Sequence, residues 1–181
     1  MKWYLLKTWV GKEEDLVKEI RNRIPSSMYE ECFVIYQERV WRKQQKSVIH
    51  VESLFPGCVF LTCQETEPLF RSLKRIPVVT KLMGTRDLEI LPLRQEDVDF
   101  LVQISGKNHI VKLSYVVKDD QGQIYKISDP LKACLDQIER YQFKKRYVMV
   151  RHRLWGEDKA IVMGIILKED AVEMRQHVDI K

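Results

Sequence analysis

The stretch Leu54-Phe55-Pro56-Gly57-Cys58-Val59-Phe60-Leu61-Thr62-Cys63 decides how the chain is expected to fold. Proline fixes φ and glycine accepts a positive φ, so the Pro-Gly pair predicts a sharp turn. The apolar run that follows, with its β-branched and aromatic side chains, favours a buried strand over a helix. We therefore expect the chain to turn at Pro56 and then to run through the middle of a sheet.

The composition is that of a folded protein. The chain has 181 residues, 45% of them hydrophobic and 31% charged, with a formal net charge of +5. This length fits one domain or two small ones. No apolar run is long enough to span a bilayer and no signal peptide is recognisable, which predicts a cytoplasmic protein without membrane contact. The four cysteines have no C-x-x-C spacing and are interpreted as reduced core residues.

The first 104 residues alternate between strand and helix patterns. Strands are predicted over residues 2–10, 32–36 and 78–82, in addition to the strand after Pro56, and residues 38–51 are predicted to form a hairpin with a basic tip. Helices are predicted over residues 13–24, 69–76 and 95–104 from their apolar spacing, and the first two are expected to end at Pro25 and Pro77. This alternation predicts an α/β sandwich, in which helices pack on one face of an antiparallel or mixed sheet.

The pattern changes after a short polar segment at residues 105–109, which we interpret as a linker. Short β-prone pieces follow at residues 110–117, 123–127, 135–141, 146–151 and 160–167. Closely spaced short strands of this kind are typical of a small all-β barrel. The predicted fold class is therefore α+β, with an α/β sandwich in residues 1–104 and a β barrel in residues 110–181.

Motifs of the common enzyme classes are missing from the sequence. There is no glycine-rich phosphate loop, no G-x-S-x-G and no H-E-x-x-H, and the four histidines show no ligand spacing. The sequence thus predicts no catalytic site, no metal and no cofactor. A cysteine nucleophile paired with a histidine across the fold stays open as an alternative.

Two groups of residues are candidate binding surfaces. One combines Trp3, Tyr4, Trp9, Phe55 and Cys58, which form either core or an apolar face for a partner's helices. The other is the stretch 140–153, in which six cations and several aromatic residues occur without a carboxylate. Runs of charge are usually solvated loops, but cations mixed with aromatic rings are also what phosphate neutralisation and base stacking require.

These motifs resemble the NusG-type transcription elongation and antitermination factors. The Trp3-Tyr4 strand, the Phe55-Pro56-Gly57 turn and the stretch from Leu73 to Gly84 resemble the N-terminal, NGN-type domain of that family. Residues 128–138, 147–150 and 154–156 resemble its KOW module, a small SH3-like barrel. The details look closest to the LoaP-type paralogues, which are processive antiterminators. The resemblance implies an NGN-type domain at 1–104 and a KOW-type domain at 110–181.

The resemblance also implies partners and site residues for a monomeric factor. The N-terminal domain is expected to bind the clamp helices of RNA polymerase through Trp3, Tyr4, Phe55, Pro56 and Cys58. The hairpin tip is expected to meet the non-template DNA strand or the polymerase, and the KOW domain an RNA hairpin in a leader transcript. The implied nucleic-acid-binding residues are Arg42, Lys43, Lys46, Lys132, Arg140, Lys144, Lys145, Arg146, Arg151 and Arg153.

Some positions depart from the family pattern. Cys58 stands where the family has an aromatic residue, and Asp129, Ala133 and Asp136 replace glycines in the KOW loop, which restricts the backbone angles there. The alternative function is that of a general NusG-like factor, whose barrel recruits a ribosomal protein or a termination factor instead of RNA. Residues 154–156 occupy the place of such a contact.

Overall fold

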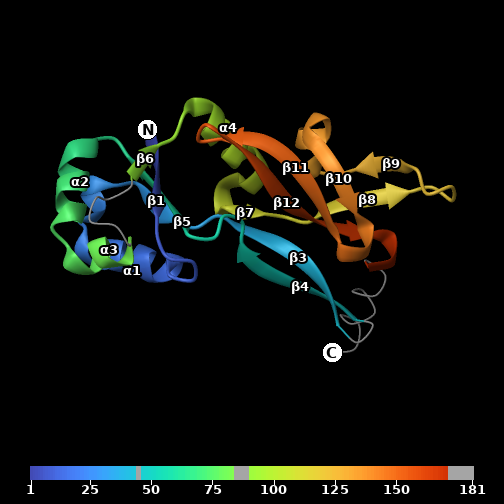
Figure 1. Cartoon of the computed structure of the whole chain (residues 1–181), viewed down its shortest axis with the longest axis horizontal. Coiled ribbons are helices and arrows are strands. Elements are labelled where there is room, and N and C mark those ends of the chain that lie inside the picture. The colour runs from blue at the N-terminus through green and yellow to red at the C-terminus, as the bar shows by residue number, and fades with distance from the viewer. Residues whose placement is uncertain (44–45, 84–89, 171–181) are drawn as a thin grey trace. The chain divides into compact units, whose positions relative to one another are not determined.

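The computed structural model describes residues 1–43, 46–83 and 90–170, which divide into two compact units. The first unit comprises residues 1–35 and 55–99, and the second comprises residues 36–54 and the chain from residue 100 onward (Figure 1). The predicted turn at Gly84 lies outside the described residues. In the described part of the chain, no helix is both long enough and apolar enough to cross a membrane.

The first unit is built on a four-stranded sheet with the strand order β2-β5-β1-β6. Its strands are β1 (Lys2–Lys7), β2 (Glu31–Phe33), β5 (Cys58–Cys63) and β6 (Ile90–Pro92). Strand β5 follows the Pro-Gly turn and pairs antiparallel with β1 on one side and β2 on the other. Val59, Phe60 and Leu61 are fully buried. The prediction of a central strand after Pro56 is confirmed.

Helices cover this sheet in the first unit. They are α1 (Glu13–Arg23), the short 3-10 helix η1 (Ser26–Met28), α2 (Thr66–Lys74) and α3 (Pro77–Leu82) (Figure 1). The face of α1 that carries Leu16 and Ile20 is buried, and α1 contacts β2, β5 and α3. A further helix, α4 (Gln95–Ser105), runs from the first unit into the second and matches the helix predicted at 95–104.

The strand predicted at residues 78–82 is wrong, because these residues form α3. The valines there favour a strand, but Pro77 occupies the first helical position, where its missing N–H costs no hydrogen bond and its φ suits a helix. The strand predicted at 2–10 ends at Lys7, and the one predicted at 32–36 ends at Phe33. Strand β6 was not predicted at all.

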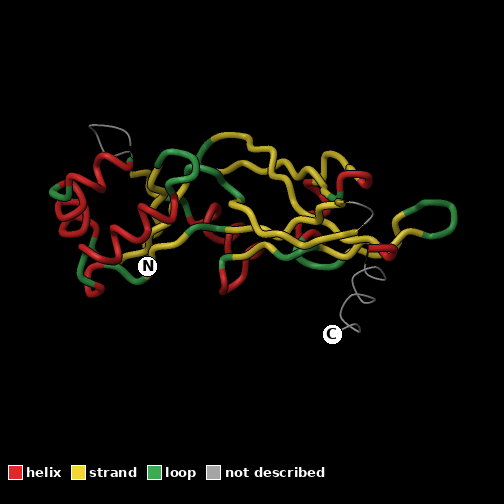
Figure 2. Tube along the Cα trace, turned by 90° about the horizontal axis from the view of Figure 1, so that it is seen from below, coloured by secondary structure: helices red, strands yellow, loops and turns green. Residues whose placement is uncertain are grey.

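In the described residues, the second unit consists mainly of strands, together with part of α4, short 3-10 helices and a helical turn at residues 168–170 (Figure 2). One sheet has the order β4-β3-β7 and the other the order β10-β11-β12-β8-β9. The strands are β3 (Tyr36–Lys43), β4 (Lys46–Ser53), β7 (Ile110–Val111), β8 (Ser114–Lys118), β9 (Ile124–Ile127), β10 (Ile138–Gln142), β11 (Tyr147–Leu154) and β12 (Glu157–Leu167). The short 3-10 helices are η2 (Gly106–Asn108), η3 (Leu131–Gln137) and η4 (Phe143–Lys145).

Two segments of the second unit differ from expectation. The β-prone piece predicted at 135–141 begins with the end of η3, and its strand starts only at Ile138. The segment 105–109, predicted as a linker, contains the last residue of α4 and the turn η2. The chain then enters β7 directly, which pairs parallel with β3.

The β3–β4 hairpin is confirmed, but the structure groups it with the C-terminal residues rather than with residues 1–104. Tyr36 of β3 pairs with Ile110 of β7. The carboxylate of Glu38 accepts hydrogen bonds from the Leu113 N–H at 3.1 Å and from the Lys112 ammonium at 2.7 Å. These partners are more than 70 residues away in the chain, so local sequence patterns do not reveal them.

Candidate functional site

Trp3 and Tyr4 belong to the core of the first unit, with only 8% and 6% of their surfaces exposed. The Trp3 ring packs edge-on against Phe33 at a centroid distance of 5.3 Å, and Tyr4 packs edge-on against Phe70 at 4.9 Å. The Tyr4 hydroxyl is hydrogen-bonded to the Thr66 hydroxyl at 2.6 Å. The structure therefore corrects the expected placement of these two residues on a binding surface.

A series of aromatic rings leads from this core to the Pro-Gly turn. Phe33 stacks on Phe60 at 5.8 Å, and Phe60 meets Phe55 edge-on at 6.2 Å. Phe55 and Cys58 are half-buried, and Pro56 between them is exposed. The remaining three residues of the predicted polymerase-binding set thus reach the surface at one turn.

Hydrogen bonds fix this turn in place. Gly57 has a φ of +79°, and its N–H donates to Oε1 of the buried Glu13 at 2.6 Å. The Thr8 N–H donates to the Gly57 carbonyl at 2.9 Å, and a Cβ atom at Gly57 would lie 3.0 Å from the Thr8 carbonyl oxygen. Glycine is thus required both for the positive φ and for the close approach of the two backbones. The sequence placed Glu13 at the start of the helix predicted over residues 13–24 and did not reveal its contact with Gly57.

The chain that follows Thr8 extends the apolar surface at the turn. Trp9 is 61% exposed and Val10 is 74% exposed, and a Val10 methyl lies 3.6 Å from the position of a Gly57 Cβ. We call the exposed and half-buried residues Trp9, Val10, Phe55, Pro56 and Cys58 the turn patch. Sequence reasoning grouped Trp9 with the aromatic cluster but left it out of the predicted polymerase-binding set, and it missed Val10.

The six cations of residues 140–153 do not form a carboxylate-free strip in space. Arg146 is 4% exposed, and its Nε lies 2.6 Å from Oδ2 of Asp170, with Glu169 at 3.2 Å from its Nη2. Arg151 donates to Oε1 of Glu139 at 2.7 Å. Glu139 directly precedes the 140–153 segment, whereas Glu169 and Asp170 follow β12 and are brought to Arg146 by the fold. Arg146 is therefore a structural residue of the second unit, which corrects its expected place on the surface.

The other predicted cations remain at the surface where the structure describes them. Lys132, Arg140, Lys144, Lys145, Arg151 and Arg153 are exposed. The backbones of Lys43 and Lys46 pair at the hairpin end, but their side chains lie outside the described residues. Arg42, Lys144 and Lys145 line one concavity of about 460 Å³ together with Val40, Trp41 and Arg146. The structure thus brings cations from two distant segments, the hairpin and η4, to one site.

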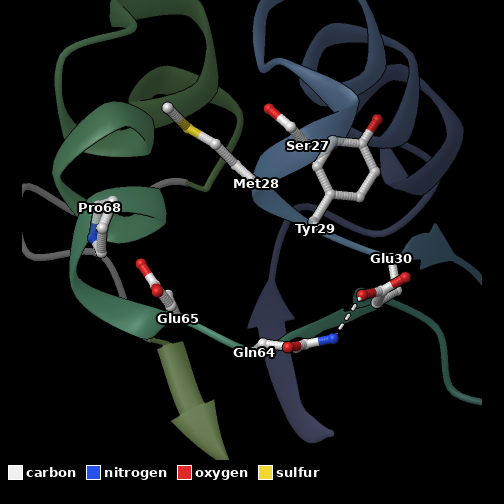
Figure 3. A pocket seen from close by; sticks show the side chains of 7 residues that line it. All are labelled: Ser27, Met28, Tyr29, Glu30, Gln64, Glu65 and Pro68. Carbon is white, nitrogen blue, oxygen red and sulfur yellow. Dashed lines mark hydrogen bonds between the residues drawn. The ribbon is translucent and has the colours of Figure 1, made fainter.

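A concavity of about 410 Å³ also lies on the first unit, between η1, the end of β5 and the start of α2 (Figure 3). Its lining residues are Ser27, Met28, Tyr29, Glu30, Gln64, Glu65 and Pro68. The Gln64 amide donates to Glu30 Oε1 at 3.2 Å (Figure 3). None of the predicted site residues lines this concavity.

All four cysteines are free thiols, and three of them are buried. Burial raises the pKa of Cys32 to about 12 and that of Cys134 to about 11, and it also raises the pKa of Cys63. These three thiols are therefore protonated at neutral pH and lack the thiolate that a nucleophile needs. Among the described residues, no group of three or more His, Cys, Asp or Glu side chains is arranged to hold a metal ion.

Comparison with known proteins gives consistent matches. A family model described as "Transcription termination factor nusG" matches residues 1–102. The transcription termination/antitermination protein NusG of Helicobacter pylori is 21% identical over 167 residues, which cover 89% of this chain and 93% of that protein. The protein of the same name from Staphylococcus epidermidis is 23% identical over 167 residues, with coverages of 88% and 90%.

The fold also has a counterpart among solved structures. The structure described as "Domain interaction in Thermotoga maritima NusG" superposes with a TM-score of 0.50 at 17% sequence identity, over 90% of this chain and 93% of that chain. This likeness confirms the predicted fold class, an α+β N-terminal domain followed by a β-rich C-terminal domain.

Proposed function

The chain belongs to the NusG family of transcription termination and antitermination factors, and we propose that it is a processive antiterminator of the LoaP type. Factors of this family bind RNA polymerase and are not enzymes. In our proposal, the protein is a cytoplasmic monomer whose first unit binds the clamp helices of the polymerase. Its second unit, which includes the KOW-type residues, binds an RNA hairpin of a leader transcript.

The observation that supports polymerase binding is the turn patch. Exposed apolar side chains on a folded unit are usually scattered singly, whereas here Trp9, Val10 and Pro56 are exposed together around one hydrogen-bonded turn. A partner's helices present apolar side chains that such a surface covers well. The hydrogen bonds of Gly57 hold the patch in one shape before binding, which lowers the entropy cost of association.

Binding at the clamp helices would act on the conformation of the polymerase. A ligand shifts an equilibrium between two states only by its difference in affinity for them. If the turn patch binds the closed, elongating clamp more tightly than the open clamp, the factor favours continued elongation. Antitermination then needs no chemistry by the factor itself.

Trp9→Ala is the variant that tests the docking surface. We expect it to weaken binding to core RNA polymerase by about 30-fold or more, as is typical for a tryptophan at the centre of an interface. Trp9 is 61% exposed, so we expect the thermal unfolding of the variant to match that of the wild type. The measurement is surface plasmon resonance on immobilised core enzyme.

Tyr125→Ala is the matched control, because Tyr125 is also an exposed aromatic residue, at 68%, but lies in the second unit. It should leave polymerase binding unchanged. Wild-type affinity in Trp9→Ala and in the double variant Trp9→Ala/Val10→Ala would remove the turn patch from the proposal. Phe55→Ala is a poorer probe, because a cavity next to Phe60 would also destabilise the fold.

A further inference from the structure

We propose that Trp41 and the cations around it form a pocket for one unpaired nucleotide of a single-stranded nucleic acid. The base would stack on the indole ring, and its phosphate would lie among Arg42, Lys144 and Lys145. This inference rests on the proposed binding of nucleic acid by the second unit. It adds a residue to that site and specifies the class of strand that the site accepts.

Trp41 is the first observation that supports the pocket. It lies on β3 opposite Val48 and is 60% exposed, which is unusual for a side chain of this size in a small folded unit. The His50 ring lies against it, with a centroid distance of 3.7 Å and an interplanar angle of 41°. His50 therefore supports part of the indole, and the exposed remainder offers ring surface on which a second flat ring can stack.

The cations form the other side of the concavity. Lys144 and Lys145 lie on η4, are exposed, and line the same concavity of about 460 Å³ as Trp41 and Arg42. This volume falls within the range of about 300–1,000 Å³ that is usual for small-ligand sites. A base next to its phosphate carries one aromatic face and one negative charge. The residues of the concavity supply a partner for each.

One buried carboxylate fixes both sides of this pocket. Asp170 accepts hydrogen bonds from Arg146 Nε at 2.6 Å, directly after η4, and from Ser47 Oγ of β4 at 3.3 Å. The Arg146 guanidinium also donates to the carbonyl of Phe143, the first residue of η4. The hairpin and the lysine-bearing turn are thus both linked to the buried Asp170 carboxylate. A pocket built in this way needs little reorganisation when a ligand enters.

The chemistry favours an unpaired strand over a duplex. Inside a duplex both faces of each base are covered by its stacked neighbours, so no face is available to an indole. Single strands, loops and bulges can turn a base outward onto an aromatic side chain. Stacking of this kind is tolerant of base identity, because each base has a π face. We therefore expect selectivity for strandedness rather than for a particular base.

The test measures fluorescence polarisation of labelled oligonucleotides with the full chain at several salt concentrations. Three probes are compared: an unstructured RNA strand, a DNA strand of the same sequence and the fully paired RNA duplex. Trp41→Ala should weaken single-strand binding by about 5- to 150-fold, the range found for loss of one base–aromatic stack, with much less effect on the duplex. Trp41→Phe should retain most of the affinity. Lys144→Ala should weaken all three complexes and reduce their salt dependence.

Matched controls separate this pocket from a general effect of the mutations. Tyr125→Ala removes another exposed aromatic ring of the second unit, and Lys126→Ala removes an exposed cation on β9. Tyr125→Ala should bind the single strand with wild-type affinity. Lys126→Ala should bind it more tightly than Lys144→Ala does. Since Trp41 is 60% exposed, Trp41→Ala should melt at the wild-type temperature.

The outcomes distinguish the pocket from the proposed function. A loss of affinity of Trp41→Ala for the RNA strand or for the DNA strand supports the pocket. Whichever of the two strands the wild-type chain binds more tightly is the ligand that the pocket prefers. Wild-type affinity in Trp41→Ala would overturn the pocket and leave nucleic-acid binding by the second unit intact. Equal losses on single strand and duplex would also overturn it. If the wild-type chain binds none of the probes, the proposed RNA role fails as well, in favour of a barrel that recruits a protein partner.

Discussion

Asp170→Ala is expected to lower the free energy of unfolding of the second unit by about 3–5 kcal/mol, the usual cost of removing one partner from a buried ion pair. Asp170 is fully buried and accepts hydrogen bonds from Arg146 Nε at 2.6 Å and from the Leu167 N–H at 2.9 Å. Its loss would leave the Arg146 guanidinium, whose side chain is 5% exposed, without its closest counter-charge. Removing one partner of a buried ion pair destabilises a protein far more than replacing both partners with apolar residues, because it leaves a buried charge without a counter-charge.

Urea unfolding followed by circular dichroism measures this effect. Glu169→Ala is the matched control, because Glu169 binds the same guanidinium at 3.2 Å but its side chain is 57% exposed. Surface ion pairs contribute about 0–1 kcal/mol, so this variant should stay close to the wild type. If Asp170→Ala is no less stable than Glu169→Ala, the ion pair between Arg146 and Asp170 does not stabilise the second unit in the way described above.

Gly164→Ala is expected to destabilise the second unit by about 1–3 kcal/mol or more, as overpacking of a closely packed site does. A Cβ atom on Gly164 of β12 would lie 2.2 Å from the carbonyl oxygen of Glu38 in β3 and 2.7 Å from Cδ2 of Leu113. A leucine side chain can rotate away, but the β3 backbone is held by its ladders with β4 and β7. The strain must therefore be relieved by separating β3 from β12.

Thermal unfolding and limited proteolysis of the hairpin report this separation. The control is Ala160→Val, which adds methyl groups at an exposed position of the same strand and should leave the melting temperature close to that of the wild type. We expect Gly164→Ala to melt at a lower temperature and the hairpin to be cleaved faster. A variant with wild-type stability and wild-type cleavage would show that β3 does not pack on β12 at Gly164.

The sequence predicted the parts of the fold that local patterns determine. Pro56 and Gly57 mark the turn, and the apolar run after them predicts the central strand β5. The four-residue spacing of Leu16 and Ile20 predicts α1. The strand predicted at residues 78–82 was wrong because two local signals disagree there. Pro77 favours the start of a helix, and this preference prevails over that of the β-branched valines for a strand.

The candidate site was predicted less well, because its geometry depends on distant residues. Periodicity places Trp3 and Tyr4 on a strand but does not say that α2 and β2 supply Phe70 and Phe33 to cover them. Composition counts Arg146 as a free cation, although Asp170 lies 24 residues further along the chain. Trp41 lies within the hairpin predicted over residues 38–51, and no sequence pattern assigned it a role. Its place beside Lys144 and Lys145 follows from a contact between segments about 100 residues apart.

We propose that this protein binds RNA polymerase through the turn patch of its first unit and an RNA strand through the concavity of its second unit that Trp41, Lys144 and Lys145 line. The most direct measurement is the amount of labelled single-stranded RNA retained on immobilised core polymerase with and without the factor. We predict that the wild-type chain increases retention and that Trp9→Ala and the double variant Lys144→Ala/Lys145→Ala each remove the increase. Retention that is the same with and without the factor, or that persists in both variants, would contradict the claim.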